Sequence, residues 1–347
     1  MNRLFAPLAA GFKLGLALRR AAYRQGWFRT RRLNRPVVSI GNLTMGGTGK
    51  TPLVRVVAEI LLNRGWNPSI LTRGYGRGGG ADIVAVPPSP GRTVDAREVG
   101  DEPAQLAEAL EKVPIVICSD RYRAGRLAED LYNVDIHLLD DGFQHWALTR
   151  DVDVVALDVT QEFSDQALLP AGRLREPCSA LERADLVVLT RMELGLPGSL
   201  EERVRRINTR APVFHASTKL HGLVDIIEGR VYPAGAFAGE VVSAFCGIGN
   251  PRAFFADLKT WGFRVAEEAA FRDHHLYKPK DLHVLANSAK RRGAVAMVTT
   301  EKDAMNLPPH LKPKLPIVAC VIQTEIHETA ALEQALFAHL EDVRVEY

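Results

Sequence analysis

The sequence predicts an α/β protein with a doubly wound, mostly parallel sheet, and two observations carry the prediction. The apolar residues 37–40 run directly into the glycine-rich segment 44–51, and a helical pattern follows. Beyond it, short apolar runs alternate with amphipathic segments, as strands and crossover helices do in such a sheet. With 347 residues, the chain is long enough for two domains.

The glycine-rich segment reads Thr-Met-Gly-Gly-Thr-Gly-Lys-Thr between the strand and the helix. Glycines let backbone N–H groups surround phosphate oxygens, Lys50 supplies charge for the β- and γ-phosphates, and Thr51 can hold Mg²⁺. The strict pattern has glycine where this chain has Thr44, and a simple glycine turn is the alternative. The context favours a P-loop NTPase-type fold, with ATP and Mg²⁺ as ligands and nucleotide contacts from Gly46, Gly47, Thr48, Gly49, Lys50 and Thr51.

Composition is that of an ordinary globular protein, with 46% apolar and 24% charged residues. The four cysteines are far apart and form no C-x-x-C pair, so we expect reduced core residues and neither a disulfide framework nor a zinc site.

Residues 1–36 form a basic segment with nine Lys and Arg side chains and no acid. A helix there would place Leu4, Phe5, Leu8, Phe12, Leu16, Tyr23 and Trp27 on one face, and Arg3, Lys13, Arg20 and Arg24 opposite. Its apolar stretch is too short to span a bilayer. Two interpretations remain: a helix on the anionic surface of a membrane, or a helix packed on the protein's own body. Nucleic acid is not an expected partner.

Strands are expected at 68–72, 82–86, 114–118, 135–139, 153–158, 186–190 and 212–216, with helices at 51–63, 102–111, 120–131, 179–184 and 199–208. The pattern then changes. A hairpin or linker at 223–240 separates a P-loop domain, 37–222, from a smaller α/β domain, 241–347. In the smaller domain strands are expected at 241–246, 263–267, 295–299 and 316–322, and helices at 251–261, 279–290 and 328–341.

Carboxylates follow the apolar run at 136–139, where Asp140 and Asp141 precede a glycine. Parallel strands end at the ligand-binding edge of a sheet, so both can reach Mg²⁺ on the phosphate loop. A simple turn is the alternative. His145 lies beyond the strand end and can face a substrate.

Three further segments carry candidate site residues. Asp101 precedes an expected helix, as either its N-cap or a general base. His274 lies in a loop of the second domain and can supply a base or its orienter. In the loop 169–177, Arg175 can clamp a phosphate and Glu176 can lie near Mg²⁺, or the loop is merely solvated. The segment 190–193 matches a guanine-reading T-K-x-D poorly, which argues against GTP.

Taken together, these segments resemble one bacterial family, the tetraacyldisaccharide 4′-kinases. The stretches that carry the resemblance span nearly the whole chain: 39–52, 72–77, 99–103, 120–123, 139–145, 169–176, 247–251 and 299–303. Thr44 is itself a habit of this family.

The resemblance implies ATP-dependent phosphorylation of the 4′-hydroxyl of a tetraacylated glucosamine disaccharide 1-phosphate, giving lipid IVA. It also implies a peripheral enzyme on the cytoplasmic face of the bacterial inner membrane. Asp101 is then the base, assisted by His274. Asp140, Asp141 and Glu176 belong to the Mg²⁺ and phosphate site beside Arg175, with Tyr75 and His145 as substrate contacts.

A second hypothesis is a membrane-associated P-loop NTPase switch of the MinD-like or metallochaperone type. It shares the phosphate loop and the basic helix, but it needs neither a carbohydrate acceptor nor the Asp101 and His274 pair. The sequence leaves the oligomeric state open.

Overall fold

The computed structural model describes residues 5–74, 81–161, 167–308, 311 and 313–344 of the chain. Tyr75, Arg3 and Leu4, which the sequence analysis singles out, lie outside these residues. None of the helices within the described ranges combines the length and the apolar character needed to cross a bilayer.

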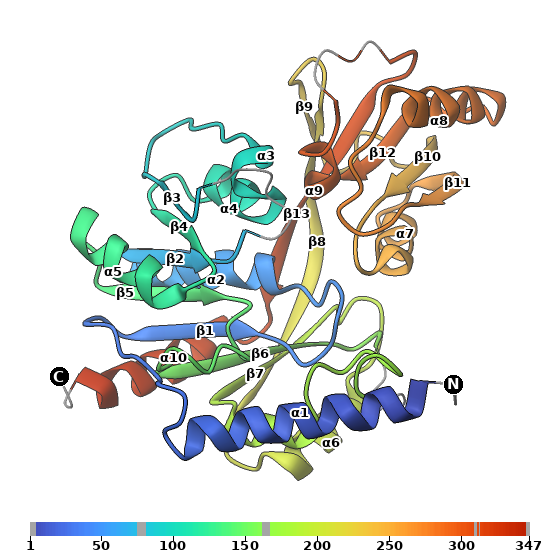
Figure 1. The fold of residues 1–347 in the computed structure, drawn as a ribbon. Helices are drawn as coiled ribbons and strands as arrows, with labels where there is room; N and C mark the ends of the chain where they lie inside the picture. The colour runs from blue at the N-terminus through green and yellow to red at the C-terminus, as the bar shows by residue number, and fades with distance from the viewer. Residues whose placement is uncertain (1–4, 75–80, 162–166, 309–310, 312, 345–347) are drawn as a thin grey trace.

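One sheet runs through the whole structure, in the order β11-β10-β12-β13-β8-β7-β6-β1-β5-β2-β4-β3, with β9 paired to β8 (Figure 1). Its pairs are parallel except β13 with β8, β3 with β4, and β8 with β9. The strands are β1 Val37–Gly41, β2 Pro68–Thr72, β3 Ile83–Val86, β4 Ile115–Cys118, β5 Ile136–Asp140, β6 Val152–Asp158, β7 Leu186–Thr190, β8 Val213–Asp225, β9 Val231–Pro233, β10 Val241–Cys246, β11 Arg264–Ala270, β12 Ala296–Thr300 and β13 Ile317–Ile326.

Helices cover both faces of the sheet, which confirms the doubly wound α/β class. They are α1 Ala6–Arg24, α2 Lys50–Asn63, α3 Ala96–Val99, α4 Asp101–Ala109, α5 Arg121–Leu131, the 3-10 helix η2 Cys178–Arg183, α6 Gly198–Ile207, α7 Pro251–Thr260, α8 Pro279–Arg291, α9 Glu301–Ala304 and α10 Thr329–Arg344. The first lobe is built on β1 to β7. There α2, α4 and α10 pack on one face of the sheet, and α5, α6 and η2 pack on the other. In the second lobe α7 and α8 belong to separate cores.

The two lobes are joined by long strands rather than by a loose linker. The expected strand at 212–216 continues to Asp225, so that β8 is 13 residues long and also forms the first strand of the expected hairpin, with β9 as the second. It pairs with the ten-residue β13, and together they run from one lobe into the other (Figure 1). After β13 the chain returns, and Leu332, Leu336 and Leu340 of α10 are buried in the core of the first lobe. The helix expected at 328–341 therefore packs outside the smaller lobe, whose own core comes from residues before it.

The basic N-terminal segment forms α1, which lies along the outside of the first lobe (Figure 1). Phe12 and Leu16 pack against the core that η2 and α6 help to form. Other apolar side chains of this segment remain exposed: Phe5, Leu8, Leu14, Leu18, Trp27 and Phe28. Both interpretations of the segment thus have a physical basis, because one side of the helix packs on the protein and another stays uncovered.

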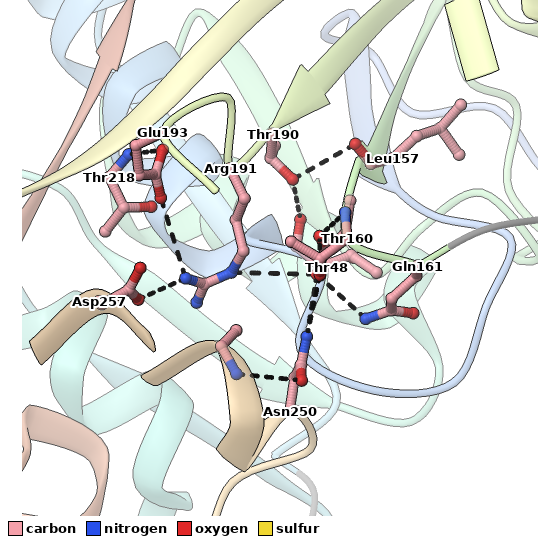
Figure 2. A network of polar contacts seen from close by, with 12 residues as sticks. Thr48, Leu157, Thr160, Gln161, Thr190, Arg191, Glu193, Thr218, Asn250 and Asp257 are labelled. Atoms are coloured by element: carbon pink, nitrogen blue, oxygen red, sulfur yellow. Dashed lines mark hydrogen bonds and ion pairs between the residues drawn. The ribbon is translucent and has the colours of Figure 1, made fainter. Parts of the chain in front are cut away.

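A polar network also ties the lobes together beside the phosphate loop (Figure 2). Arg191, which follows β7, forms an ion pair with Asp257 of α7 and lies 3.9 Å from Asp158. Asn250, at the start of α7, donates to the same Asp158 at 3.1 Å. The segment 190–193 is therefore used to join the lobes, which is a physical reason for its poor match to a base-reading motif.

Asp257 gives this network a pH dependence. Burial raises its pKa to about 6, against the opposing charge of Arg191. A carboxyl whose folded pKa exceeds its unfolded value stabilises the fold below the unfolded pKa, and that contribution is lost as the pH rises through the folded pKa. Through this carboxyl the wild type should lose about 3 kcal/mol of unfolding free energy between pH 4 and pH 7. We expect Asp257→Asn to lack this loss.

Urea unfolding of the wild type and of Asp257→Asn across this range measures the difference. The exposed Glu240→Gln on the same lobe is the matched control and should keep the wild-type slope. Identical pH dependence in the wild type and Asp257→Asn would contradict the prediction.

Candidate active site

The phosphate loop leaves β1 and enters α2, as the sequence predicts. Gly49 is the N-cap of α2 with a φ of 77°, and Gly46 has a φ of 115°, a conformation that side chains other than hydrogen seldom allow. The backbone carbonyl of Thr48 accepts a hydrogen bond from Thr190 at 3.0 Å. Thr51 lies in the first turn of α2. The loop thus aims the positive end of the helix dipole at the space above β1.

The second lobe covers this loop closely. A Cβ on Gly249 would lie 2.7 Å from the backbone nitrogen of Gly47 and 2.8 Å from Cα of Gly46. Such distances exclude any side chain at position 249. Glycine is required there for the loop after β10 to reach the phosphate loop.

Asp140 and Asp141 lie beside the phosphate loop because β5 is the parallel neighbour of β1, with Asp140 in register with Ile40. The Asp141 carboxylate lies 3.4 Å from Nζ of Lys50 and accepts hydrogen bonds from Arg175 at 2.8 and 2.6 Å. Burial opposes the charge of Asp141, but Lys50 and Arg175 outweigh it and lower its pKa. The φ of Asp141 is 52°, a left-handed conformation that is rare without glycine and often marks a functional site.

Asp140 is in a different electrostatic environment. It is buried, and the hydroxyl of Thr72 donates to it at 3.0 Å. Burial, together with the charges of Glu102 and Asp141, raises its pKa to about 7. Excess negative charge of this kind fits a divalent cation, whose charge favours the ionised carboxylate.

Over the described part of the chain, no three His, Cys, Asp or Glu side chains converge as a metal cage. Mg²⁺ does not need one, since it commonly takes one or two carboxylates and completes its shell with phosphate oxygens and water. The donors beside the phosphate loop therefore fit Mg²⁺ bound together with a nucleotide.

The loop 168–176 is attached to the phosphate loop by backbone hydrogen bonds. Arg175 N donates to the carbonyl of Leu43 at 2.7 Å, and Met45 N donates to the carbonyl of Arg173 at 2.8 Å. These bonds bring Arg175 to Asp141. Glu176 instead forms an ion pair with Arg183, whose guanidinium lies 3.7 Å from the ring centre of Phe143. Its expected place near Mg²⁺ stays a prediction. The ion pair with Arg183 already neutralises this carboxylate, which leaves it less charge for a cation.

Asp101 and His274 meet across the two lobes. Asp101 is the first residue of α4, and His274 lies after β11 with a φ of 58°. Nδ1 of His274 is 2.8 Å from Oδ2 of Asp101, and the buried carboxylate also accepts from its neighbour, Glu102 N, at 2.9 Å. The hydrogen bond to Asp101 raises the pKa of His274. Burial alone would raise the pKa of Asp101, but His274 and Lys302 outweigh it and lower that pKa.

Arg121 lies near Asp140 and Asp141, and His145 lies near Arg121. Burial and the charges of Arg121 and Arg150 lower the pKa of His145 to about 4, so its imidazole is uncharged at neutral pH. Arg121 is buried, and its Nε has no partner among the described residues. Its signal in the sequence is the stretch 120–123, which contributes to the family resemblance but does not by itself indicate a role for Arg121.

Lys302 was missed in the same way. It belongs to the quoted stretch 299–303, yet its side chain contacts both members of the Asp101 and His274 pair. Nothing in the local sequence indicates that Lys302 lies close to Asp101, because the two residues are about two hundred positions apart in the chain.

Comparison with known proteins gives a consistent result. Residues 1–341 match the family model described as Tetraacyldisaccharide-1-P 4′-kinase. The chain is 40% identical over 337 residues to the tetraacyldisaccharide 4′-kinase of Geobacter metallireducens, with 96% of each chain covered. It is 38% identical to that of Geobacter sulfurreducens, covering 97% of this chain and 93% of the relative.

Among solved structures, that of LpxK from Aquifex aeolicus in complex with ATP superimposes with a TM-score of 0.75 and 29% identity, covering 96% of this chain and 98% of that one. The match to the family model extends over nearly the full length, and the curated relatives agree with it. The chain belongs to the tetraacyldisaccharide 4′-kinase family.

Proposed function

We propose that the protein is an ATP-dependent kinase that phosphorylates the 4′-hydroxyl of a tetraacylated glucosamine disaccharide 1-phosphate, forming lipid IVA in lipid A biosynthesis. Family membership supports the reaction. The observation that carries it in the structure is the hydrogen bond between His274 and Asp101, which joins a general base to the lobe that holds the phosphate loop. A nucleotide switch has no use for such a pair.

Lys50 and Arg175 bind the transferred phosphoryl group. Both now neutralise Asp141, so they already lie where negative charge is to be stabilised. Mg²⁺, held by the Thr51 hydroxyl and the carboxylates of Asp140 and Asp141, would supply further neutralisation of the phosphates. Because phosphoryl transfer needs positioning and charge more than covalent help, these groups supply most of what the protein must provide.

The His274 and Asp101 pair takes the proton of the acceptor hydroxyl. Asp101 is the base that the family resemblance implies, but this carboxylate is buried and already accepts three hydrogen bonds, whereas the imidazole is only partly buried. We therefore assign Nε2 of His274 as the proton acceptor, with Asp101 stabilising the imidazolium. The hydroxyl oxygen then forms a bond to the γ-phosphorus as the bond to the β–γ bridging oxygen breaks, and ADP leaves.

The acceptor's anionic headgroup binds beside Arg121 and His145, which lie close to each other. A buried guanidinium with an unpartnered Nε is suited to a phosphate oxygen, and the neutral imidazole can hydrogen-bond a sugar hydroxyl. Tyr75, outside the described residues, is retained as a further substrate contact. The acyl chains stay in the bilayer.

The partner surface is the cytoplasmic face of the inner membrane, to which α1 attaches the enzyme peripherally. The exposed leucines of α1, and Trp27 just after it, supply apolar contacts, and the nine basic side chains of residues 1–36 supply attraction to anionic lipid.

Incubating the purified protein with ATP, Mg²⁺ and the disaccharide 1-phosphate in mixed micelles separates the kinase from the switch. The kinase gives a 4′-phosphorylated product that mass spectrometry detects. ATP hydrolysis unaffected by the disaccharide, with no product, would favour the switch instead.

Lys50→Met should lower kcat by at least about 10²-fold, because one preorganised charge at the transferred phosphoryl group is lost. Arg55→Met, on the outer side of the same helix and paired with Glu59, is the matched control and should retain activity. Steady-state kinetics measures both, and near-normal turnover of Lys50→Met would show that the loop does not bind the phosphates.

His274→Asn and Asp101→Asn should each lower kcat by about 10²-fold or more while leaving ATP affinity nearly unchanged. Because the two residues act as a unit, the double variant should be no slower than the slower single variant. His275→Asn is the control, since this adjacent histidine pairs with Asp281. Additive losses in kcat would contradict a shared role.

Leu14→Ser/Leu18→Ser should lower partitioning onto anionic vesicles at least about tenfold, since each exposed leucine contributes about 1.5 kcal/mol or more when buried in lipid. Val231→Ser/Leu276→Ser removes two exposed apolar side chains from the second lobe and should bind as the wild type does. Vesicle sedimentation measures both, and equal binding by all three proteins would exclude α1 as the contact.

A further inference from the structure

Lys302 lies at the centre of the contact between the lobes, although neither the phosphate loop nor the acceptor surface includes it. Only 16% of its side chain is exposed. Its ammonium group is 3.2 Å from Asp273, 3.4 Å from Glu102 and 3.9 Å from Asp101. These acids come from both lobes, so the Lys302 ammonium group contacts α4 of the first lobe and the loop after β11 of the second.

The short helix α9 holds Lys302 in place through the next residue, Asp303. This buried carboxylate accepts hydrogen bonds from Gly247 N and from the hydroxyl of Tyr277, both at 2.7 Å. His274 N in turn donates to the Gly247 carbonyl at 3.0 Å. The lysine and the imidazole are therefore fixed to the same backbone segment, and their separation does not depend on loose surface loops.

The contact between Lys302 and His274 determines the position of the imidazole proton. Nζ of Lys302 is 3.3 Å from Nε2 of His274. An ammonium group has only donors, so Nε2 must accept, and the ring proton then lies on Nδ1. That Nδ1–H donates to Asp101 at 2.8 Å. The contact is favourable only while the ring is neutral, because a protonated ring would place two cations 3.3 Å apart.

The pKa of His274 responds to both neighbours. The hydrogen bond to Asp101 raises it above the ordinary value, and the charge of Lys302 lowers it and so limits the rise. Burial lowers the pKa of Lys302, but Glu102, Asp101 and Asp273 outweigh burial and raise it, so that Lys302 remains charged.

We infer that Lys302 is a positioning residue for the His274 and Asp101 pair: it fixes the Nδ1–H tautomer and opposes protonation of the imidazole before the acceptor hydroxyl releases its proton. This rests on the proposed role of the pair as proton acceptor. The proton moves from the hydroxyl to Nε2, and Lys302 withdraws to Asp273 and Glu102, which it already contacts. Asp101, Asp273 and Lys302 are charged groups that face His274, and Glu102 faces Lys302.

The direct test is the titration of His274 in the full-length protein labelled with ¹⁵N-histidine, with His274→Asn assigning the signal. Lys302→Met should raise the pKa of His274 by at least about one unit and weaken its preference for the Nδ1–H tautomer. Lys302→Arg keeps the charge and should restore most of the wild-type pKa. Lys290→Met removes an exposed lysine from the same lobe and should change nothing.

A second variant covers the case in which Lys302→Met does not fold. Asp273 is exposed, and its carboxylate lies 3.8 Å from Nε2 of His274, where its charge raises the pKa of the ring. Asp273→Asn should therefore lower that pKa. An unchanged pKa of His274 in every variant that folds, or an Nε2–H tautomer in the wild type, would overturn the inference.

The kinetic counterpart is the acidic limb of kcat against pH, measured with saturating ATP, Mg²⁺ and disaccharide. We expect the limb to move upward in Lys302→Met and downward in Asp273→Asn, following the titration, whereas a purely structural role for Lys302 would lower kcat equally at all pH values. If the titration shifts and the limb does not, the inference about Lys302 holds and the pair is not the proton acceptor.

Discussion

The hydrogen bond between His274 and Asp101 constrains the rest of the structure, because its two partners come from different lobes and need a separation of 2.8 Å. Several features of the fold hold the two residues at this distance. The strands β8 and β13 carry one hydrogen-bonded ladder through both lobes, which limits how far they can separate. Arg191 and Asn250 add polar contacts on the side of the phosphate loop. Gly249 lets the second lobe approach that loop without a side chain between them.

Charge is distributed between the two halves of the site in opposite ways. Beside the phosphate loop, Asp141 is neutralised by Lys50 and Arg175, while Asp140 is buried among acids with its pKa raised to about 7. Mg²⁺ bound with the nucleotide would offset the negative charge around Asp140. In the other half, Lys302 balances three acids, and its charge opposes the rise that Asp101 causes in the pKa of the imidazole. The site can therefore bind a cation beside the phosphate loop and accept a proton at His274. The cation-binding carboxylates come from the first lobe and the imidazole from the second.

The sequence was most informative where the chemistry is local. The strand at 37–41, the glycines and Lys50 form one continuous segment, so the phosphate loop could be predicted without the structure, and β2 and β7 match their expected bounds. Contacts between distant segments were harder. The bond of Asp101 to His274 was expected only through family resemblance, the pairing of Glu176 with Arg183 was not foreseen, and Lys302 received no role. A strand that continues past a register shift, as β8 does beside Gly222, resembles two short strands because its burial pattern is irregular.

The N-terminal helix shows how the substrate constrains the enzyme. An acyl chain leaves lipid at a cost of about 0.8 kcal/mol per CH₂, so four such chains hold the disaccharide firmly in the bilayer and the phosphate loop must approach the membrane surface. A helix that packed all of its apolar residues on the protein could not attach the phosphate loop to the membrane surface. A helix that packed none of them would have no defined orientation relative to the active site. In α1, Phe12 and Leu16 fix the helix to the first lobe while Leu14 and Leu18 stay exposed. The helix can therefore hold the first lobe, which carries Lys50, in a defined orientation toward the lipid.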